Sequence, residues 1–162
     1  MLTIVSGGQT GVDRAALDAA IAAGWPYRGW CPKGGWAEDR PDPPGVRAHY
    51  PALQETPDSS PAQRTAWNVR DADALIVLVD GRGLAVSKGT ALALAQAEQT
   101  GKPHIVIDLD GPDAQAQAQH FLGTRPGQAV CVAGPRESEA PGIYNKARTL
   151  FEAVIGGSPS AA

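Results

Sequence analysis

The stretch Ile4-Val5-Ser6-Gly7-Gly8-Gln9-Thr10-Gly11-Val12-Asp13-Arg14 decides the fold of this chain. An apolar run over residues 2–5 stops at a small polar loop, and a helical pattern begins directly after it. Glycines in such a turn let the backbone approach a ligand, and the free N–H groups of the first helical turn point at it. The turn therefore predicts a site for phosphate or another anion. The alternative is a tight turn that binds nothing.

The glycine pattern itself is of neither common nucleotide-binding type. No Lys-Ser or Lys-Thr pair follows the glycines, so the turn is not a Walker loop, and the full GxGxxG pattern is absent. The side chains of Ser6, Gln9 and Thr10 add donors that suit an oxyanion. Taken alone, the turn indicates the charge of the ligand and leaves its identity open.

The composition describes one ordinary globular domain. The chain has 162 residues, of which 43% are hydrophobic and 19% charged. A net charge of -3 argues against a general nucleic-acid binder. No apolar run approaches the roughly 20 residues that a membrane span needs, and no basic segment typical of a signal peptide precedes the first strand. With only two cysteines, far apart, we expect a cytoplasmic protein without a disulfide framework.

Apolar runs alternate with helical patterns along the chain. We expect strands at 2–6, 74–79, 104–109 and 129–133, a shorter one at 27–30, and an edge piece at 46–50. Helices are expected at 12–23, 61–71, 88–100, 112–122 and 141–155. This order predicts an α/β, Rossmann-like fold: an open, mostly parallel sheet with helices on both faces, in a single domain over residues 1–156. Residues 157–162 are expected to form a flexible tail.

A second strand-to-helix turn carries Ser87, Lys88, Gly89 and Thr90. Ligands of open α/β sheets lie beyond the carboxyl ends of the strands, so both glycine-containing turns are expected at one crevice. Arg136 follows the last strand and is predicted to contact an anion there. The alternative for Thr90 is simple helix capping.

The long loop over residues 31–44 carries further candidates. Lys33 suits contact with an anion, and Glu38 with Asp39 suits a sugar hydroxyl or a cation. Arg64 and Asn68 share one face of a helix and either reach the crevice or form surface hydrogen bonds. The alternative for the loop residues is a solvated charged segment. No His or Cys pair has metal-ligand spacing, so we predict no metal site and no catalytic triad.

Several of these motifs occur together in one known family. They are Ser6-Gly-Gly-Gln-Thr-Gly-Val-Asp-Arg14, Gly29-Trp-Cys-Pro-Lys-Gly34, Ala37-Glu-Asp39, Gly101-Lys-Pro103 and Ala133-Gly-Pro-Arg-Glu-Ser138. The chain resembles the molybdenum carrier family, the circularly permuted YpsA branch of the SLOG superfamily, from about residue 3 to 155. The resemblance implies a Rossmann-like fold, a homo-oligomer (dimer or tetramer), and binding of the molybdenum cofactor, of molybdate, or of a related phosphate-bearing ligand, with molybdoenzymes as possible partners. By position, the implied ligand contacts are Ser6, Gly7, Gly8, Gln9, Thr10, Gly11, Lys33, Ser87, Lys88, Gly89, Thr90 and Arg136.

Two departures bear on catalysis. The related LOG phosphoribohydrolases place a catalytic glutamate shortly after a Gly-Thr pair, whereas here Gly89-Thr90 is followed by Ala91-Leu92-Ala93, and Glu98 comes two turns later. Lys88 also stands where the family has a glycine. We therefore predict a binding or carrier protein with no catalytic residue. The alternatives are a LOG-like nucleotide hydrolase that uses Glu38 or Asp39 as its acid, and a sensor of ADP-ribose-like nucleotides.

Overall fold

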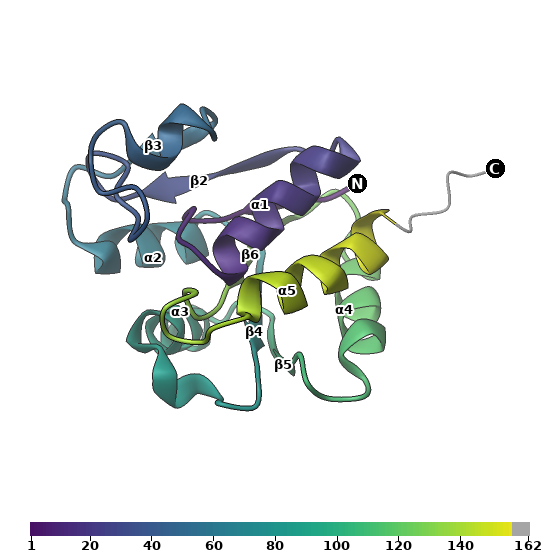
Figure 1. Cartoon of the computed structure of the whole chain (residues 1–162). Coiled ribbons are helices and arrows are strands. Elements are labelled where there is room, and N and C mark those ends of the chain that lie inside the picture. The colour runs from purple at the N-terminus through teal and green to yellow at the C-terminus, as the bar shows by residue number, and fades with distance from the viewer. Residues whose placement is uncertain (157–162) are drawn as a thin grey trace.

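Six parallel strands form one sheet in the order β3-β2-β1-β6-β4-β5 in the computed structural model, which describes residues 1–156 (Figure 1). The expected tail, 157–162, lies outside the described residues. The strands are β1 Thr3–Val5, β2 Tyr27–Cys31, β3 Leu53–Glu55, β4 Ala74–Val79, β5 His104–Asp108 and β6 Ala129–Ala133. The predicted Rossmann-like α/β fold is confirmed, and the sheet is parallel throughout.

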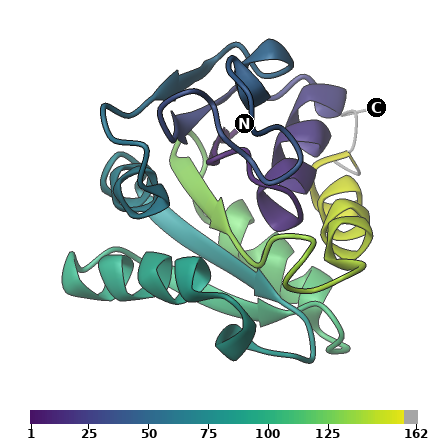
Figure 2. The same ribbon diagram turned by 60° about the vertical axis from the view of Figure 1, so that its left-hand side comes forward.

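Helices cover both faces of this sheet, as Figure 2 shows. Three of them, α1 Val12–Ala23, α4 Ala114–Gly123 and α5 Ile143–Phe151, pack on one face, and a single π-helical turn, Glu152–Gly156, extends α5. The other face is covered by α2 Pro61–Arg70 and α3 Lys88–Gln99. Each face has its own hydrophobic core, and β4, between them, is buried at all six positions. This double burial explains why β4 has a continuous apolar sequence.

The edge of the sheet differs from the prediction. Residues 46–50 do not form an edge strand: Gly45–Ala48 is a 3₁₀ turn, and the edge strand is β3, seven residues after Val46. Val46 packs with Leu53 in a small separate core over Leu17 and Cys31. The apolar residue that suggested a strand is therefore buried by a turn.

The inner face of α2 carries polar residues. Arg64 and Asn68, which were expected either at the crevice or at the surface, are buried together with Val69, whereas Ala62 is exposed. Asn68 accepts a hydrogen bond from Trp30 N at 2.7 Å and donates one to Trp30 O at 2.9 Å. The inward polar residues of α2 therefore bind polar groups of other elements, which periodicity of apolar residues does not reveal.

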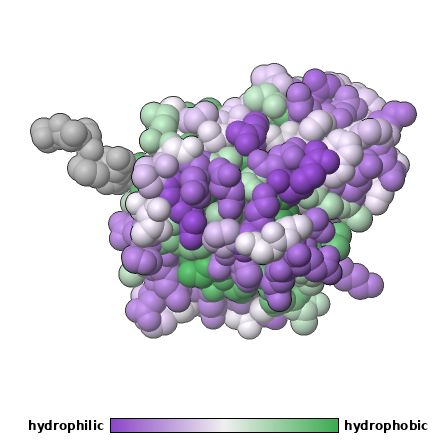
Figure 3. Space-filling model, turned by 180° about the vertical axis from the view of Figure 1, so that it is seen from behind, coloured by the Kyte–Doolittle hydropathy of each residue, from purple (hydrophilic) through white to green (hydrophobic). Residues whose placement is uncertain are grey.

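The molecular surface carries few large apolar side chains. Among the described residues, the exposed large hydrophobic ones are Met1, Ile21, Leu92 and Val106. Figure 3 shows the face opposite to that of Figure 1, where hydrophilic residues predominate around smaller hydrophobic patches. No helix within residues 1–156 combines the length and apolarity that crossing a bilayer requires.

Candidate functional site

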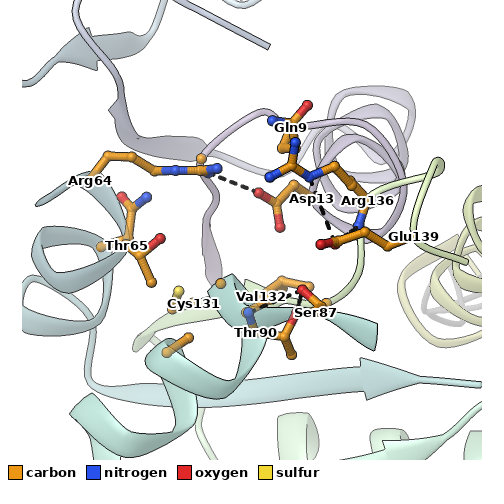
Figure 4. A pocket seen from close by; sticks show the side chains of 16 residues that line it. Gln9, Asp13, Arg64, Thr65, Ser87, Thr90, Cys131, Val132, Arg136 and Glu139 are labelled. Atoms are coloured by element: carbon orange, nitrogen blue, oxygen red, sulfur yellow. Dashed lines mark hydrogen bonds and ion pairs between the residues drawn. The ribbon is translucent and has the colours of Figure 1, made fainter. Parts of the chain in front are cut away.

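A cavity of about 60 Å³ lies beyond the carboxyl ends of the central strands, between the two glycine-containing turns (Figure 4). We call it the central cavity. Its lining comes from the first turn and α1, from α2, from the start of α3, and from β6 with the loop that follows it. The lining residues are Gly7, Gln9, Asp13, Arg64, Thr65, Asn68, Ser87, Gly89, Thr90, Ala93, Cys131, Val132, Ala133, Gly134, Arg136 and Glu139.

Arg64 crosses one wall of the central cavity and meets Asp13. Its Nη1 atom donates to Asp13 Oδ2 at 3.2 Å, and both side chains are about one-tenth exposed, at 10% and 11%. The guanidinium lies against Gly7, where a Cβ atom would come within 1.8 Å of Arg64 Nη1. Gly7 is thus required for close approach of Arg64 rather than only for a turn.

Two buried donors at this cavity have no partner within the described part of the chain. Gln9 Oε1 accepts from the N–H groups of Thr10 and Glu38, both at 3.0 Å, which fixes the amide orientation and leaves Gln9 Nε2 unsatisfied. Arg64 Nε is unsatisfied as well. The two residues are only 6% and 9% exposed. Since an unpaired buried donor is costly, both atoms point to an absent acceptor.

The start of α3 adds further donors. Ser87 caps the helix, since its Oγ accepts from Thr90 N at 3.2 Å, and the two hydroxyl oxygens lie 2.7 Å apart. Their mutual hydrogen bond uses one of two hydroxyl protons, so one remains for the cavity. The N–H groups of the first turn, including that of Gly89, have no partner within the helix. Both predicted roles for this turn, capping and lining a site, are therefore compatible.

Arg136 stands at the rim, with 34% of its side chain exposed. It lies 3.8 Å from Glu139 and 3.8 Å from Glu38, and 5.9 Å from the centre of the Trp36 ring. Its backbone N–H donates to Glu139 Oε1 at 3.0 Å. Arg136 thus connects the central cavity to the long loop.

Burial determines the direction of the pKa shift of two groups at the cavity, Asp13 and Cys131. Burial raises the pKa of Asp13, against the opposing effects of Arg64, a hydrogen bond from the Gln9 backbone, and Arg14. Burial also raises the pKa of the Cys131 thiol, with a further contribution from the charge of Asp13, so this thiol stays neutral. Asp13 is consequently a carboxyl group whose ionisation is opposed by burial and favoured by Arg64.

The structure brings half of the predicted contact residues to the central cavity. Gly7, Gln9, Ser87, Gly89, Thr90 and Arg136 line it. Ser6 and Gly8 are buried and do not line the cavity. Ser6 Oγ donates to the carbonyl oxygen of Asp13, and the carbonyl oxygen of Gly8 accepts from Arg14 Nε. The side chains of Lys33 and Lys88 are exposed and line neither this cavity nor the cleft described next.

A larger cleft of about 750 Å³ lies on the other side of the first turn. We call it the tyrosine cleft; it is lined by Thr10, Gly11, Arg14, Asp18, Glu38, Asp39, Arg40, Tyr50, Glu137, Ser138 and Tyr144. Its carboxylates are all bound. Tyr50 and Tyr144 donate to the two oxygens of Asp18 at 2.5 and 2.6 Å, Arg14 holds Asp39 at 2.9 Å, and backbone N–H groups of 142 and 144 bind Glu137.

Glu38 joins three segments at the edge of this cleft. It accepts from Thr10 Oγ1, from Ser138 N at 3.2 Å and from Ser138 Oγ at 2.5 Å. Partial burial raises its pKa, but the hydrogen bonds from Ser138 and Thr10 outweigh this, and the net result is a lowered pKa. Glu38 and Asp39, the acids considered for hydrolysis, therefore lie outside the central cavity and are ionised, hydrogen-bonded groups.

Sequence reasoning did not single out Asp13, Cys131 or Glu139. Asp13 reads as an ordinary acid of a first helical turn, and its partner Arg64 is 51 residues away. The one available signal was position: Cys131 and Glu139 lie in or after β6, at the strand end where ligands of such folds bind.

The comparisons with known proteins agree with this architecture. The family model described as circularly permutated YpsA SLOG matches residues 4–155. A crystal structure from Syntrophus aciditrophicus SB, named as that of a candidate molybdenum carrier protein, superposes with a TM-score of 0.81 at 38% sequence identity, covering 96% of this chain and 95% of the other. No curated protein matches the chain in sequence. On the family match and this likeness, the chain belongs to the circularly permutated YpsA SLOG family.

Proposed function

We propose that this protein binds and carries a phosphate-bearing ligand, the molybdenum cofactor or a close relative of it, and delivers it to molybdoenzymes. The observation that carries the proposal is the pair of unpartnered buried donors, Gln9 Nε2 and Arg64 Nε, at a cavity where two anion-type turns meet. A tetrahedral oxyanion offers acceptors to both donors, to the α3 N-terminus and to Arg136. The name of the Syntrophus structure supports a molybdenum-related cargo.

The size of the central cavity indicates which part of the ligand it would hold. Its volume is small, about 60 Å³, and its lining is largely polar, which suits a single oxyanion better than a pterin ring. The cavity would thus take the terminal phosphate of the cofactor, or free molybdate, and the remainder of a larger ligand would lie outside it.

The test is calorimetric titration of the purified protein with inorganic phosphate, AMP and molybdate, together with measurement of molybdenum retained after expression in cells that make the cofactor. Gln9→Glu replaces only the unpartnered amide nitrogen by oxygen and keeps the acceptor that Thr10 and Glu38 bind. We expect this variant to bind about 100-fold more weakly, because a charge-assisted donor becomes a repelling anion. Gln99→Glu, on the exposed end of α3, is the matched control and should bind as the wild type does. If no oxyanion and no cofactor binds the wild type, the proposal is wrong.

The raised pKa of Asp13 favours one second candidate, a hydrolase of nucleoside monophosphates. Asp13 would then supply the acid that the sequence lacks after Thr90. Incubation with AMP and detection of free adenine decides between the two. Release of adenine that Asp13→Asn abolishes would establish the hydrolase; intact AMP with measurable binding supports the carrier.

A further inference from the structure

Asp13 is an acceptor in a cavity whose other buried groups mostly donate. Arg64 occupies one side of its Oδ2 atom at 3.2 Å. An ionised carboxylate has about four acceptor positions, so Asp13 retains capacity toward the cavity that it lines. In Figure 4 its carboxyl group lies between Arg64 and Arg136, with Ser87 and Thr90 on the facing side. A ligand held by those donors would place an oxygen atom against the Asp13 carboxylate.

Two oxygen atoms in contact need a proton between them. Inorganic phosphate carries a proton at neutral pH, and a phosphate monoester, whose second pKa is about 6, takes one up at little cost, whereas sulfate and molybdate are fully ionised and far weaker bases. We propose that Asp13 makes the central cavity select a phosphate group that shares a proton with it, and reject sulfate and molybdate. This inference rests on the proposed function and narrows it: the molybdenum cofactor would be held by its phosphate and not by its metal end.

The surroundings of Asp13 support proton sharing. Arg64 faces it from α2, Arg136 and Glu139 from the loop after β6, and the neutral Cys131 thiol from β6; Arg14 follows it in α1. Arg64 is the one cation in hydrogen-bond contact with it among the described residues, and burial opposes its ionisation. A fully ionised ligand would bind only after Asp13 takes up a proton, so its affinity would fall as the pH rises.

The experiment compares hydrogen phosphate with sulfate, which at pH 8 have the same charge and a similar tetrahedral shape and differ in one proton. Dissociation constants are measured by calorimetry at pH 6 and pH 8, with molybdate as a third probe. For the wild type at pH 8, we expect phosphate to bind about 100-fold more tightly than sulfate or molybdate, since a site built to accept a hydrogen bond rejects analogues that lack the donor. The preference should shrink at pH 6. In Asp13→Asn, whose amide can donate, sulfate should bind within about threefold of phosphate at both pH values.

Each result separates the inference from the function on which it rests. Equal affinity for phosphate and sulfate in the wild type at pH 8 overturns the inference and leaves the carrier standing; absence of all oxyanion binding overturns the carrier. The preference for phosphate over sulfate could instead be lost in Glu139→Gln and kept in Asp13→Asn. That result would assign the preference to Glu139, the other carboxylate of the cavity, and would refute its assignment to Asp13. Asp71→Asn, a surface carboxylate paired with Arg70, is the control and should retain the selectivity. If Asp13→Asn does not fold, the affinities of the wild type for phosphate and sulfate at pH 6 and pH 8 still decide whether binding requires a proton shared between the ligand and Asp13.

Discussion

The central cavity and the tyrosine cleft lie on opposite sides of the same glycine-rich turn, yet their polar groups are arranged differently. In the cleft, which has the larger volume, each carboxylate already accepts hydrogen bonds from the protein, such as those that Tyr50 and Tyr144 donate to Asp18. In the smaller cavity, Gln9 Nε2 and Arg64 Nε are buried without acceptors. Among the described residues the cleft also has one buried donor without an acceptor, Arg40 Nε, so the two spaces differ in degree. The smaller cavity has two such donors beside two glycine-containing turns, which makes it the better candidate for an anion site despite its smaller volume.

Gly11 belongs to the turn that borders both spaces and lines the tyrosine cleft, and its replacement should have the largest effect. Its φ of +80° is in the left-handed region, and a Cβ atom would lie 2.4 Å from Pro135 O. Gly11→Ala should lower the free energy of unfolding by about 3 kcal/mol or more, because backbone strain and a clash with main-chain atoms add. Urea denaturation measures this. Gly101→Ala, which has φ +68° but open space around its Cβ, is the control and should lose only about 1 kcal/mol. Equal losses would show that the contact with Pro135 is unimportant.

Arg64→Met tests the cavity against the cleft directly. Methionine fills similar volume but removes the partner of Asp13 and one of the unpartnered donors, so the affinity for phosphate should drop about 100-fold. Arg148→Met removes an arginine near Asp18 on the cleft side and should change that affinity less than about twofold. Calorimetry at pH 7 measures both. A drop of similar size in the two variants would contradict the assignment of the anion site to the central cavity.

Glu38→Gln tests the link between the two spaces and should have the smallest effect. The lowered pKa of Glu38 means that its ionised form stabilises the fold above the usual glutamate value of 4.5, and that this contribution disappears as the pH falls through the lower folded-state value. The variant should therefore lose roughly 1 kcal/mol of unfolding free energy at pH 7 and less as the pH is lowered toward 3. The exposed Glu98→Gln should show no such difference. A loss of the same size at both pH values would mean that the hydrogen bonds do not depend on the charge.

The sequence was sufficient for five of the six strands and for one wall of the candidate site. Continuous apolar runs such as residues 74–79 predict buried parallel strands because local pattern and burial coincide there. The pattern failed at Val46, whose side chain is buried by a turn, and at Leu53–Glu55, where a short edge strand pairs only with β2. The Arg64–Asp13 pair could not be predicted from the sequence for another reason. Both residues are polar and far apart in the chain, and the packing of α2 against β2 brings them together.

The position of β1 has a consequence for the order of events during synthesis. β1 pairs with β2 on one side and with β6 on the other, so the middle of the sheet joins the beginning of the chain to residues 129–133. A nascent chain that has already made β1 and β2 still exposes one edge of β1 until β6 leaves the ribosome. Glu139 and Arg136 follow β6, so the walls of the central cavity meet only after residues 129–139 have been made. A chain that ends before β6 would thus lack a complete central cavity.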